Sequence, residues 1–379
     1  MRLLEYEAKE IFKNFGIPVP KGTVVKSPAE AASAIEKVGL PLVVKAQVPV
    51  GGRGKAGGIK SADSFEEAVK KVETLLNTNL KGYTVRSVLL EEKLKIAKEY
   101  YLGVTIDQSA GKPVVMFSTE GGVDIEEIAK DKPETLVSKK VSLSRGFYEF
   151  EARAMCKKLG LKGPLLVKIS DILYKLYEIF VKYDAIIAEI NPLVVTENGE
   201  AFAADAKIEI DDDALYRQTS LHIKPEERVE DPLRAEAIKI GVTYVRLDGD
   251  IGIIGSGAGL TMATIDIIND FGGNAANFLE TGGGINEQLM YDAVKLLARD
   301  KRLKALFINL YGGINPMVQA ANGIAKAYKE LKLNIPILVK LVGNEQEKAW
   351  EILENVGIPV IKSIQTEDAI EKLMKILRG

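Results

Sequence analysis

A lysine at the end of an apolar run precedes a loop rich in glycine and basic residues. The run LPLVVK ends at Lys45, and the loop Gly51–Gly58 reads GGRGKAGG. Glycine lets a ligand approach the backbone, and lysine and arginine neutralise phosphate. The loop is not a P-loop, because alanine follows its Gly-Lys pair where that motif needs serine or threonine. The pattern predicts a phosphate-binding loop of another kind, although a lysine on an edge strand is a common alternative.

Oxygen-bearing side chains recur in a segment that predicts two strands joined by a turn at Asn198-Gly199. Glu189 and Asn191 share one strand face, and Asp205 and Lys207 share another. A three-residue turn with a left-handed glycine pairs Asn191 with Asp205 and Glu189 with Lys207. That register gathers hard oxygen ligands suited to Mg²⁺.

The same hairpin allows other interpretations. A two-residue turn pairs Pro192 with Asp205 and points Asn191 away from it. An ordinary half-exposed strand pair with a Glu189–Lys207 ion pair also fits the residues. Spacing alone leaves the metal site and the ordinary strand pair equally open. We expect the acidic run Asp211–Asp213 to be a solvated strand end.

Three glycine-rich loops follow apolar runs in the second half of the chain. They read GSGAG (255–259), ETGGG (280–284) and YGGIN (311–315), and a helical pattern follows each. Ligands of parallel sheets bind beyond the carboxyl ends of the strands, and helix N-termini favour anions. Three such loops favour a binding site over simple tight turns. GSGAGL lacks the third glycine of the dinucleotide fingerprint, so a nicotinamide dehydrogenase is a poor interpretation.

The elements that carry these residues form two patterns. Residues 1–218 mix helices with strands that can pair antiparallel, which predicts an α+β region. From Asp250 onward, five strand–loop–helix units follow one another, which predicts a doubly wound parallel sheet. The charged, Pro-bearing segment 222–232 reads as a linker, and the boundary is expected between residues 218 and 248.

Composition limits the classes of function. The net charge of −2 does not favour binding to nucleic acid or to acidic membranes. No apolar run is long enough to span a bilayer. The lone Cys156 excludes a disulfide framework or a cysteine-based metal cluster, and its helical pattern places it in a core. It also fits a reducing compartment, so we expect a cytoplasmic protein. The lone histidine, His222, is expected at the surface.

These segments, in this order, resemble the β subunits of succinate–CoA ligases over essentially the whole chain. The matching segments are LLEYEAKEIF, VVKAQV, GGRGKAGG, AKEYYLGV, STEGGVDIE, AEINPLVV, DGDIG, GAGLTMATIDII, ANFLETGGG and GGI. Several are weak alone, but together they are specific. The resemblance implies an ATP-grasp domain over residues 1–235, followed by a flavodoxin-like CoA-ligase domain over residues 236–379.

The resemblance also implies roles for particular residues in the first domain. Asn191 and Asp205 match the Mg²⁺-binding positions, and Glu189 matches the acidic position that contacts a phosphohistidine. The STEGGVDIE stretch matches a loop around the phosphates. The positions that match ATP-binding residues are Lys45, Gly52, Arg53, Gly54, Glu91, Leu94 and Glu99.

In the second domain, the resemblance implies substrate-contacting positions at Ser256, Gly313, Ile314 and Asn315. Two departures from the family leave the acid open. Ser256 stands where the family usually has asparagine, and Asn315–Val318 replace a hydrophobic residue followed by Arg-Cys-Asp. Pro20 and the GKAGG sequence resemble ATP-using rather than GTP-using members.

The family reaction joins a carboxylic acid to CoA at the expense of ATP, through a phosphohistidine. The only histidine, His222, lies outside every matched segment, so the resemblance implies an α subunit that carries the phosphohistidine and most of the CoA site. We expect an ADP-forming ligase for succinate. The alternatives are a ligase for malate or another acid, and a non-catalytic nucleotide-binding regulatory subunit.

Overall fold

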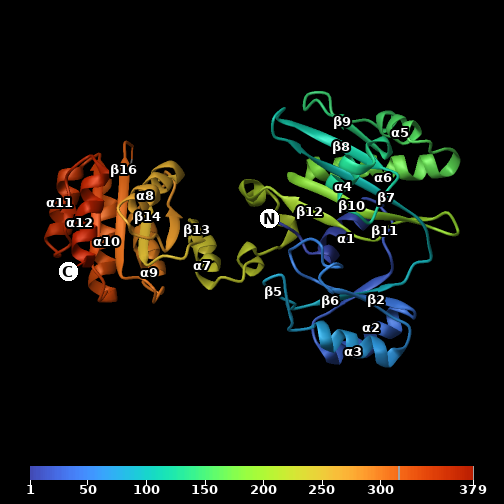
Figure 1. Ribbon diagram of the computed structural model, residues 1–379, viewed down its shortest axis with the longest axis horizontal. Helices are drawn as coiled ribbons and strands as arrows, with labels where there is room; N and C mark the ends of the chain where they lie inside the picture. Colours follow the sequence, from blue (N-terminus) through green and yellow to red (C-terminus); the bar gives the residue numbers. More distant parts are fainter. Residues whose placement is uncertain (315, 379) are drawn as a thin grey trace. The chain divides into compact units, whose positions relative to one another are not determined.

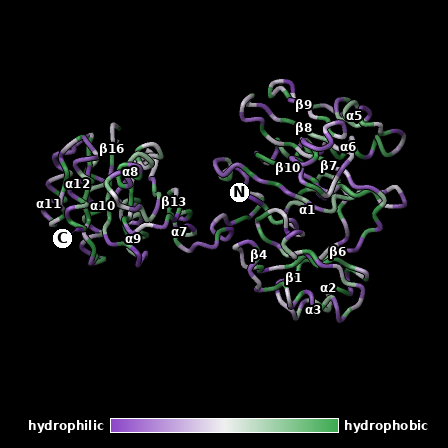
Figure 2. Tube along the Cα trace, in the orientation of Figure 1, coloured by the Kyte–Doolittle hydropathy of each residue, from purple (hydrophilic) through white to green (hydrophobic). Residues whose placement is uncertain are grey.

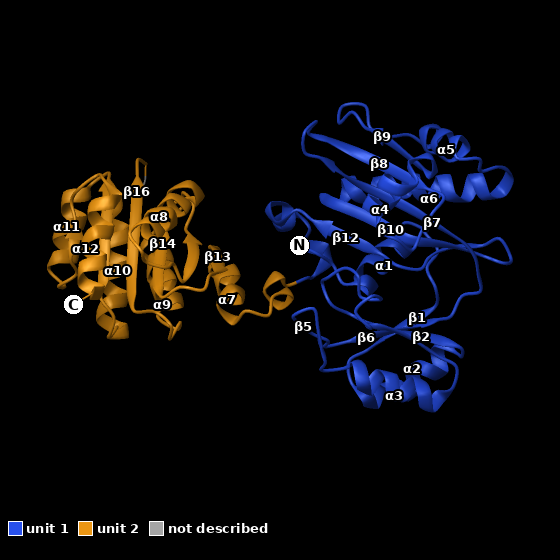
Figure 3. Cartoon of the chain, viewed as in Figure 1, with its two compact units in different colours: residues 1–223 blue, residues 224–379 orange. Residues whose placement is uncertain are grey.

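The computed structural model describes residues 1–314 and 316–378 of the chain. These residues separate into two units, Met1–Ile223 and Lys224–Gly379 (Figure 3). The division falls inside the segment 218–248 that the sequence assigns to the boundary. The domain limits 1–235 and 236–379 stay a prediction. Among the described helices, none is long and apolar enough to cross a membrane.

The first unit begins with a small antiparallel sheet that carries the glycine-rich loop. Its strands, in order, are β1 (Gly22–Val25), β6 (Val88–Glu92), β2 (Leu42–Ala46) and β3 (Ile59–Ala62). Accompanying elements are η1 (Pro28–Glu30), α2 (Ala31–Val38), α3 (Phe65–Leu75), β4 (Asn79–Leu80) and β5 (Tyr83–Thr84). Helix α3 begins after Ser64, whose hydroxyl accepts the Glu67 N–H at 3.2 Å, a cap that typically contributes about 1 kcal/mol.

A larger antiparallel sheet forms the rest of the first unit. Its strand order is β11-β10-β7-β8-β9, and β12 also pairs with β10. The strands are β7 (Ile96–Asp107), β8 (Lys112–Ser118), β9 (Leu136–Lys140), β10 (Ala185–Thr196), β11 (Ala201–Ala203) and β12 (Lys207–Ile210). The helical segments are α4 (Ile125–Asp131), η2 (Pro133–Thr135), α5 (Glu149–Lys158), α6 (Gly163–Lys182), η3 (Asp212–Arg217) and η4 (Thr219–Leu221).

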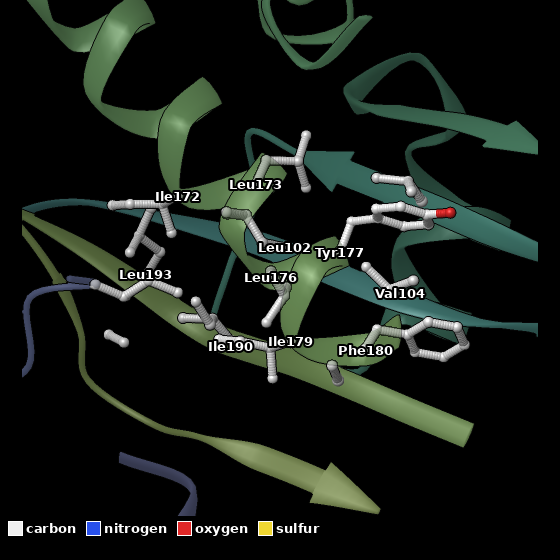
Figure 4. Packing of buried hydrophobic residues seen from close by; sticks show 14 of the residues in the cluster. Leu102, Val104, Ile172, Leu173, Leu176, Tyr177, Ile179, Phe180, Ile190 and Leu193 are labelled. Atoms are coloured by element: carbon white, nitrogen blue, oxygen red, sulfur yellow. The ribbon is translucent and has the colours of Figure 1, made fainter. Parts of the chain in front are cut away.

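Helix α6 packs its apolar face on β7 and β10 (Figure 4). Residues Leu173, Leu176 and Phe180 recur at helical spacing, and all three are buried. Leu102 of β7 and Leu193 of β10 belong to the same cluster. The apolar residues at helical spacing in α6 and the inward-facing residues of the strands therefore pack into one core. This core holds β10, the first strand of the hairpin, in place.

Helix α1 (Glu5–Asn14) lies between the two sheets of this unit (Figure 1). Its apolar residues Ala8, Ile11 and Phe12 pack into the core of the larger sheet. Tyr6 N–H donates to the side chain of Gln47, just beyond the end of β2, at 3.1 Å. Hence α1 contacts both sheets, and its buried polar residues Glu5 and Lys9 lie where the sheets meet.

The second unit is a six-stranded sheet with the order β13-β15-β14-β16-β17-β18. The strands are β13 (Thr243–Arg246), β14 (Ile251–Gly255), β15 (Asn277–Glu280), β16 (Ala305–Gly312), β17 (Ile337–Gly343) and β18 (Val360–Ile361). The helical segments are η5 (Pro225–Arg228), α7 (Pro232–Ile240), α8 (Ala258–Asp270), α9 (Glu287–Leu297), α10 (Met317–Leu331), α11 (Gln346–Glu354) and α12 (Thr366–Arg378).

The five predicted strand–helix units are confirmed as a parallel array from β14 to β18. Helices α8 and α12 share one hydrophobic cluster with the sheet, and α9, α10 and α11 share another, so both faces are covered. Figure 2 shows hydrophobic and hydrophilic stretches alternating along these helices, as amphipathic helices on a sheet require. The predicted doubly wound architecture is therefore confirmed.

The linker assignment for segment 222–232 was wrong at its end, and the antiparallel strand β13 was missed. Asp231 is the N-cap of α7 and accepts the Leu233 N–H at 2.8 Å, while Pro232 occupies the first helical turn. The segment is rich in charged residues, so its sequence did not indicate that a helix begins at Pro232.

Candidate active site

A cavity of about 380 Å³ opens in the first unit between the glycine-rich loop and the hairpin. It gathers residues that lie far apart in the sequence. The lining includes Arg2, Glu5, Lys45, Gly51, Gly52, Arg53, Gly54, Lys55, Gly122, Val123, Asp124, Glu189, Asn191, Asp205 and Lys207. Among the predicted ATP, metal and catalytic positions, the structure thus brings together Lys45, the loop 52–54, Glu189, Asn191 and Asp205.

The glycine-rich loop joins β2 to β3 by tight backbone turns. Gly52 and Gly57 adopt positive φ angles of 67° and 77°, a region that favours glycine. The Gly58 N–H donates to the Arg53 carbonyl at 2.8 Å and closes the loop. A Cβ at Gly58 would lie 2.7 Å from a Leu80 methyl and 3.2 Å from the Arg53 carbonyl oxygen, so a larger residue would force Leu80 to shift. The loop backbone consequently sits at the cavity wall with the Arg53 side chain directed inward.

Lys45 is almost fully buried, and oxygen atoms surround its ammonium group. Nζ lies 2.9 Å from Glu5 Oε1, 2.6 Å from Glu91 Oε2 and 2.6 Å from the Ala204 carbonyl oxygen. Burial by itself would lower the pKa of Lys45, but Glu5, Glu91 and Asp205 outweigh that effect and raise it. The lysine is therefore charged and fixed at the cavity.

Arg53 connects the loop to the hairpin and to α1. Its Nη2 lies 2.8 Å from Asp205 Oδ1, its Nη1 lies 2.8 Å from Glu5 Oε2, and Nη1 also donates to the Ala46 carbonyl at 3.1 Å. The pKa of Arg53 is raised, because Glu5 and Asp205 together outweigh the opposing effect of burial. Two cations suited to phosphate thus face one cavity.

The hairpin adopts the three-residue turn. Glu189 pairs with Lys207 and Val195 with Ala201, and Gly199 has a φ of 74°. This register is the one that places Asn191 opposite Asp205, and both residues line the cavity. The two-residue alternative is excluded.

The residues of the hairpin fit a magnesium ion that shares its coordination with phosphate. Mg²⁺ in nucleotide sites is held by one or two protein oxygens together with water and phosphate. Asp205 offers a carboxylate whose side chain is 37% exposed, and Asn191 offers an amide oxygen. Among the described residues, no group of three or more histidine, cysteine, aspartate or glutamate side chains forms a complete metal site. The donor set therefore suits a metal that arrives with its substrate.

Asn191 also ties the hairpin to the loop of the STEGGVDIE stretch. Its Oδ1 accepts the Gly122 N–H at 2.8 Å, and its Nδ2 donates to the Val123 carbonyl at 2.9 Å. On the other side of the cavity, Lys55 Nζ lies 2.7 Å from Asp124 Oδ2. The two loops thereby meet over the cavity through an exposed ion pair.

Glu189 points into the same cavity from β10. Its Oε2 lies 3.5 Å from Lys207 Nζ and 3.5 Å from the Tyr101 hydroxyl. Burial raises the pKa of Glu189, and the Lys207 charge only partly offsets this effect. The expected cross-strand ion pair is present, and the residue still has access to a ligand.

The predicted nucleotide positions Glu91, Leu94 and Glu99 lie along the connection from the small sheet to the larger one. Glu91 ends up in the charge cluster with Lys45 rather than in the lining of the first cavity. Glu99 lines a second, more open cavity of about 790 Å³, and Leu94 is half-buried and lines neither cavity. The structure does not bring these three side chains into one pocket.

The loops of the second unit share one edge of its sheet. Ser256 follows β14, and its hydroxyl accepts the Tyr311 N–H at 2.8 Å and donates to the Tyr311 carbonyl at 3.1 Å. Gly313 and Ile314 follow β16 on the same edge and are exposed, whereas Asn315 lies outside the described residues. The structure therefore links the GSGAG and YGGIN loops through Ser256.

Sequence reasoning missed Glu5 and Lys9 of α1. Lys9 Nζ lies 2.7 Å from Glu5 Oε1 and 2.5 Å from Glu91 Oε1, and both side chains are buried. The signal was available, because residues 5, 9 and 12 share one face of a helix and Phe12 is apolar. The surface position of His222 and the core position of Cys156 are confirmed.

Comparison with known proteins agrees with these two units. The ATP-grasp domain family matches residues 2–195, and the CoA-ligase family matches residues 254–374. A GDP-forming succinate–CoA ligase subunit β from Thermus thermophilus is 45% identical over 379 residues, all of both chains. ADP-forming counterparts from Ignicoccus hospitalis and Methanocaldococcus jannaschii are 43% and 44% identical over the full length of this chain.

A solved structure has the same fold over almost the whole chain. It is an ATP citrate lyase from Methanothrix soehngenii, with a TM-score of 0.79 and 19% identity, and the match covers 98% of this chain and 99% of that one. At this identity the similarity concerns the fold alone. The two family models show an ATP-grasp unit followed by a CoA-ligase unit. The chain belongs to the family of succinate–CoA ligase β subunits.

Proposed function

We propose that this chain is the β subunit of an ADP-forming succinate–CoA ligase, which converts ATP, succinate and CoA into ADP, phosphate and succinyl-CoA. The observation that carries the proposal is the meeting of Lys45 and Arg53 with Asn191 and Asp205 at one cavity. Two fixed cations beside two oxygen ligands suit a nucleotide that binds with Mg²⁺. The full-length family match supports the same assignment.

In the proposed first step, Lys45, Arg53 and the backbone of residues 52–54 hold the phosphates of ATP. Asn191 and Asp205 would hold the Mg²⁺ that accompanies ATP, and the ion would supply positive charge that stabilises the transferring group. A histidine nitrogen of the partner attacks the γ-phosphorus, the bond to the bridging oxygen breaks, and ADP leaves. Glu189 faces the cavity where it can orient the imidazole, and Glu91, Leu94 and Glu99 are proposed for the nucleoside.

The histidine must come from a second chain. His222 is exposed and does not line the cavity, and it is the only histidine of this sequence. We therefore assign the phosphohistidine, and most of the CoA site, to an α subunit. The lone buried Cys156 agrees with the cytoplasmic location that we propose.

The second half of the reaction uses loops of the second unit. The succinate carboxylate attacks phosphorus and the N–P bond breaks, which leaves an acyl phosphate. The CoA sulfur then attacks the acyl carbon and phosphate leaves. Ser256, Gly313, Ile314 and Asn315 are proposed to contact the acid.

The test uses this chain co-purified with its α subunit. Thioester formation is measured with succinate, malate and other acids, each with ATP or GTP. We expect succinate with ATP to give the highest kcat/KM. Turnover with another acid but none with succinate would reassign the substrate.

A second measurement follows phosphate from γ-labelled ATP to the α subunit. We expect label on a histidine of the partner, with a requirement for Mg²⁺. Absence of label in a preparation whose α subunit accepts phosphate from another β subunit would favour a regulatory role for this chain.

A further inference from the structure

Glu5 brings a negative charge to the cavity proposed for phosphate. It is the first residue of α1, and its side chain is 1% exposed. Its Oε1 lies 2.9 Å from Lys45 Nζ and its Oε2 lies 2.8 Å from Arg53 Nη1. Burial would raise the pKa of this carboxyl, but Lys45, Lys9 and Arg53 hold it well below its ordinary value. An ionised carboxylate thus contacts both cations on which phosphate binding depends.

Lys45 has no N–H left for a phosphate in this arrangement. An ammonium group has three N–H donors, and three oxygens lie within 2.9 Å of Nζ. Glu5 and Ala204 line the cavity, whereas Glu91 does not. A phosphate that approaches Lys45 through the cavity therefore meets Glu5 and the Ala204 carbonyl first.

Of these two acceptors, Glu5 is the one that can be exchanged. The Ala204 carbonyl belongs to a backbone segment fixed by its own N–H, which donates to the Pro192 carbonyl at 3.1 Å. Glu5 retains a partner when it leaves Lys45, because its Oε1 also lies 2.7 Å from Lys9 Nζ. Lys9 does not line the cavity, so it can hold the displaced carboxylate away from a bound nucleotide.

The charges of the cluster balance among its own side chains. Lys9, Lys45 and Arg53 are linked by ion pairs to an equal number of carboxylates, namely Glu5, Glu91 and Asp205. Phosphate oxygens add negative charge next to Glu5, and like charges at close range in a buried site repel strongly. Nucleotide binding must overcome both this repulsion and the existing ion pairs.

We infer that Glu5 sets the nucleotide affinity of the ATP site, because its carboxylate occupies Lys45 and Arg53 until phosphate oxygens replace it. Glu5 is then an affinity-setting residue that moves towards Lys9 when ATP binds and returns when ADP leaves. The inference rests on the proposed function, since it takes the cavity to be the phosphate site. It adds a residue of the N-terminal helix that competes with the phosphates for the cations of that site.

The experiment compares ATP binding to the wild-type complex and to Glu5→Gln by titration calorimetry, with and without Mg²⁺. Glutamine keeps the shape of the side chain and removes the competing charge. We expect the Kd for ATP to fall by about tenfold in both conditions, as one removed like charge would give. An unchanged or higher Kd would overturn the inference and make Glu5 a support for Lys45 instead.

Lys9→Met is the matched control, because it removes one buried charge from the same helix but from outside the cavity. Glu5 stays on Lys45 and Arg53 in this variant, so we expect no gain in affinity. An equal gain in both variants would show that a loosened α1, rather than Glu5, is responsible.

A double variant, Glu5→Gln with Lys9→Met, keeps the test decisive if Glu5→Gln fails to fold. It restores the charge balance of the cluster, and its affinity is compared with that of Lys9→Met. If the wild-type complex does not bind ATP at all, the proposed function itself is refuted. If the wild-type complex binds ATP and phosphorylates the partner histidine, but neither variant that carries Glu5→Gln binds ATP more tightly than its reference, only the role of Glu5 is refuted.

Discussion

Arg53 Nη2 lies 2.8 Å from Asp205 Oδ1, across 152 residues of sequence. The pair joins the glycine-rich loop of one sheet to the hairpin of the other. Because Asp205 is also a proposed magnesium ligand, this ion pair joins a cation proposed for phosphate to a carboxylate proposed for the metal. A nucleotide that brings its metal would offer partners to both residues, so we expect nucleotide binding and metal binding to be coupled.

Replacing Asp205 by alanine should abolish Mg²⁺-dependent phosphorylation of the partner histidine. We expect the rate to fall at least about 100-fold, because a metal ligand and the partner of Arg53 are lost together. Circular dichroism should be unchanged, since the side chain is 37% exposed. Asp213→Ala, an exposed carboxylate beyond the same hairpin, is the control and should keep its rate. Normal labelling of the partner by Asp205→Ala would disprove the metal assignment.

The pH dependence of stability should reveal Glu189. Because burial raises its folded-state pKa, the folded chain holds the proton more tightly than the unfolded chain. Stability is therefore lost as pH rises from the ordinary glutamate pKa through the raised value. Glu189→Gln should remove that loss, so urea unfolding should show the variant more stable than wild type at pH 7 but not at pH 4. Phosphoryl transfer should fall in the same variant.

The control for this experiment is Glu209→Gln on the neighbouring strand, which does not line the cavity. The stability of the Glu209→Gln variant should depend on pH as that of the wild type does. A Glu189→Gln variant that is less stable than wild type at pH 7 would mean that the Lys207 ion pair outweighs burial.

Gly121 should tolerate no side chain. A Cβ at this position would lie 2.6 Å from the Tyr100 carbonyl oxygen, because the loop of the STEGGVDIE stretch packs directly on β7. Gly121→Ala should displace the loop, weaken ATP binding by about tenfold or more and lower the melting temperature. Gly111→Ala, at a φ of 58° in open space, should cost only about 1 kcal/mol and leave ATP binding intact. Equal effects of the two variants on ATP binding would contradict the packing explanation.

Ser256 should affect the acid rather than the nucleotide. Its hydroxyl joins two loops of the second unit by two hydrogen bonds to Tyr311, and Ser256→Ala removes both. We expect the KM for the acid to rise by about tenfold, consistent with roughly 1.4 kcal/mol. The KM for ATP should stay within about twofold, because ATP is assigned to the other unit. A variant that changes the two KM values equally would argue against an acid-binding role.

Much of the architecture follows from local patterns. The five apolar strands after Asp250, each followed by an amphipathic helix, predicted the parallel sheet because period and spacing are written directly in the sequence. The glycine-rich loops of the second unit could be located between strand and helix because the periods on either side of them are also visible in the sequence. Helix α7 and strand β13 were missed because charged residues and proline resemble a linker when the burial of Leu233 and Tyr244 is unknown.

The site could be predicted only in part. Local residues indicated a phosphate loop and a hairpin with oxygen ligands, but they left the turn of the hairpin open between two registers. The choice depends on how β10 and β12 pair along their whole length, where Glu189 meets Lys207. Resemblance to a family led us to propose roles for Lys45, Asn191 and Asp205, which composition could not suggest.

The sequence by itself determined the two patterns of elements and the position of the glycine-rich loop between two strands, and its single histidine led to the proposal of a partner subunit. Only the tertiary structure decided which charges meet. The helical spacing of Glu5, Lys9 and Phe12 could indicate a buried face, but only the packing of α1 between two sheets brings Glu5 to Lys45 and Lys9 to Glu91. These ion pairs join residues that are far apart in the sequence, so they form only because α1 packs against both sheets. No local sequence pattern encodes the contact between α1 and Lys45 or Glu91.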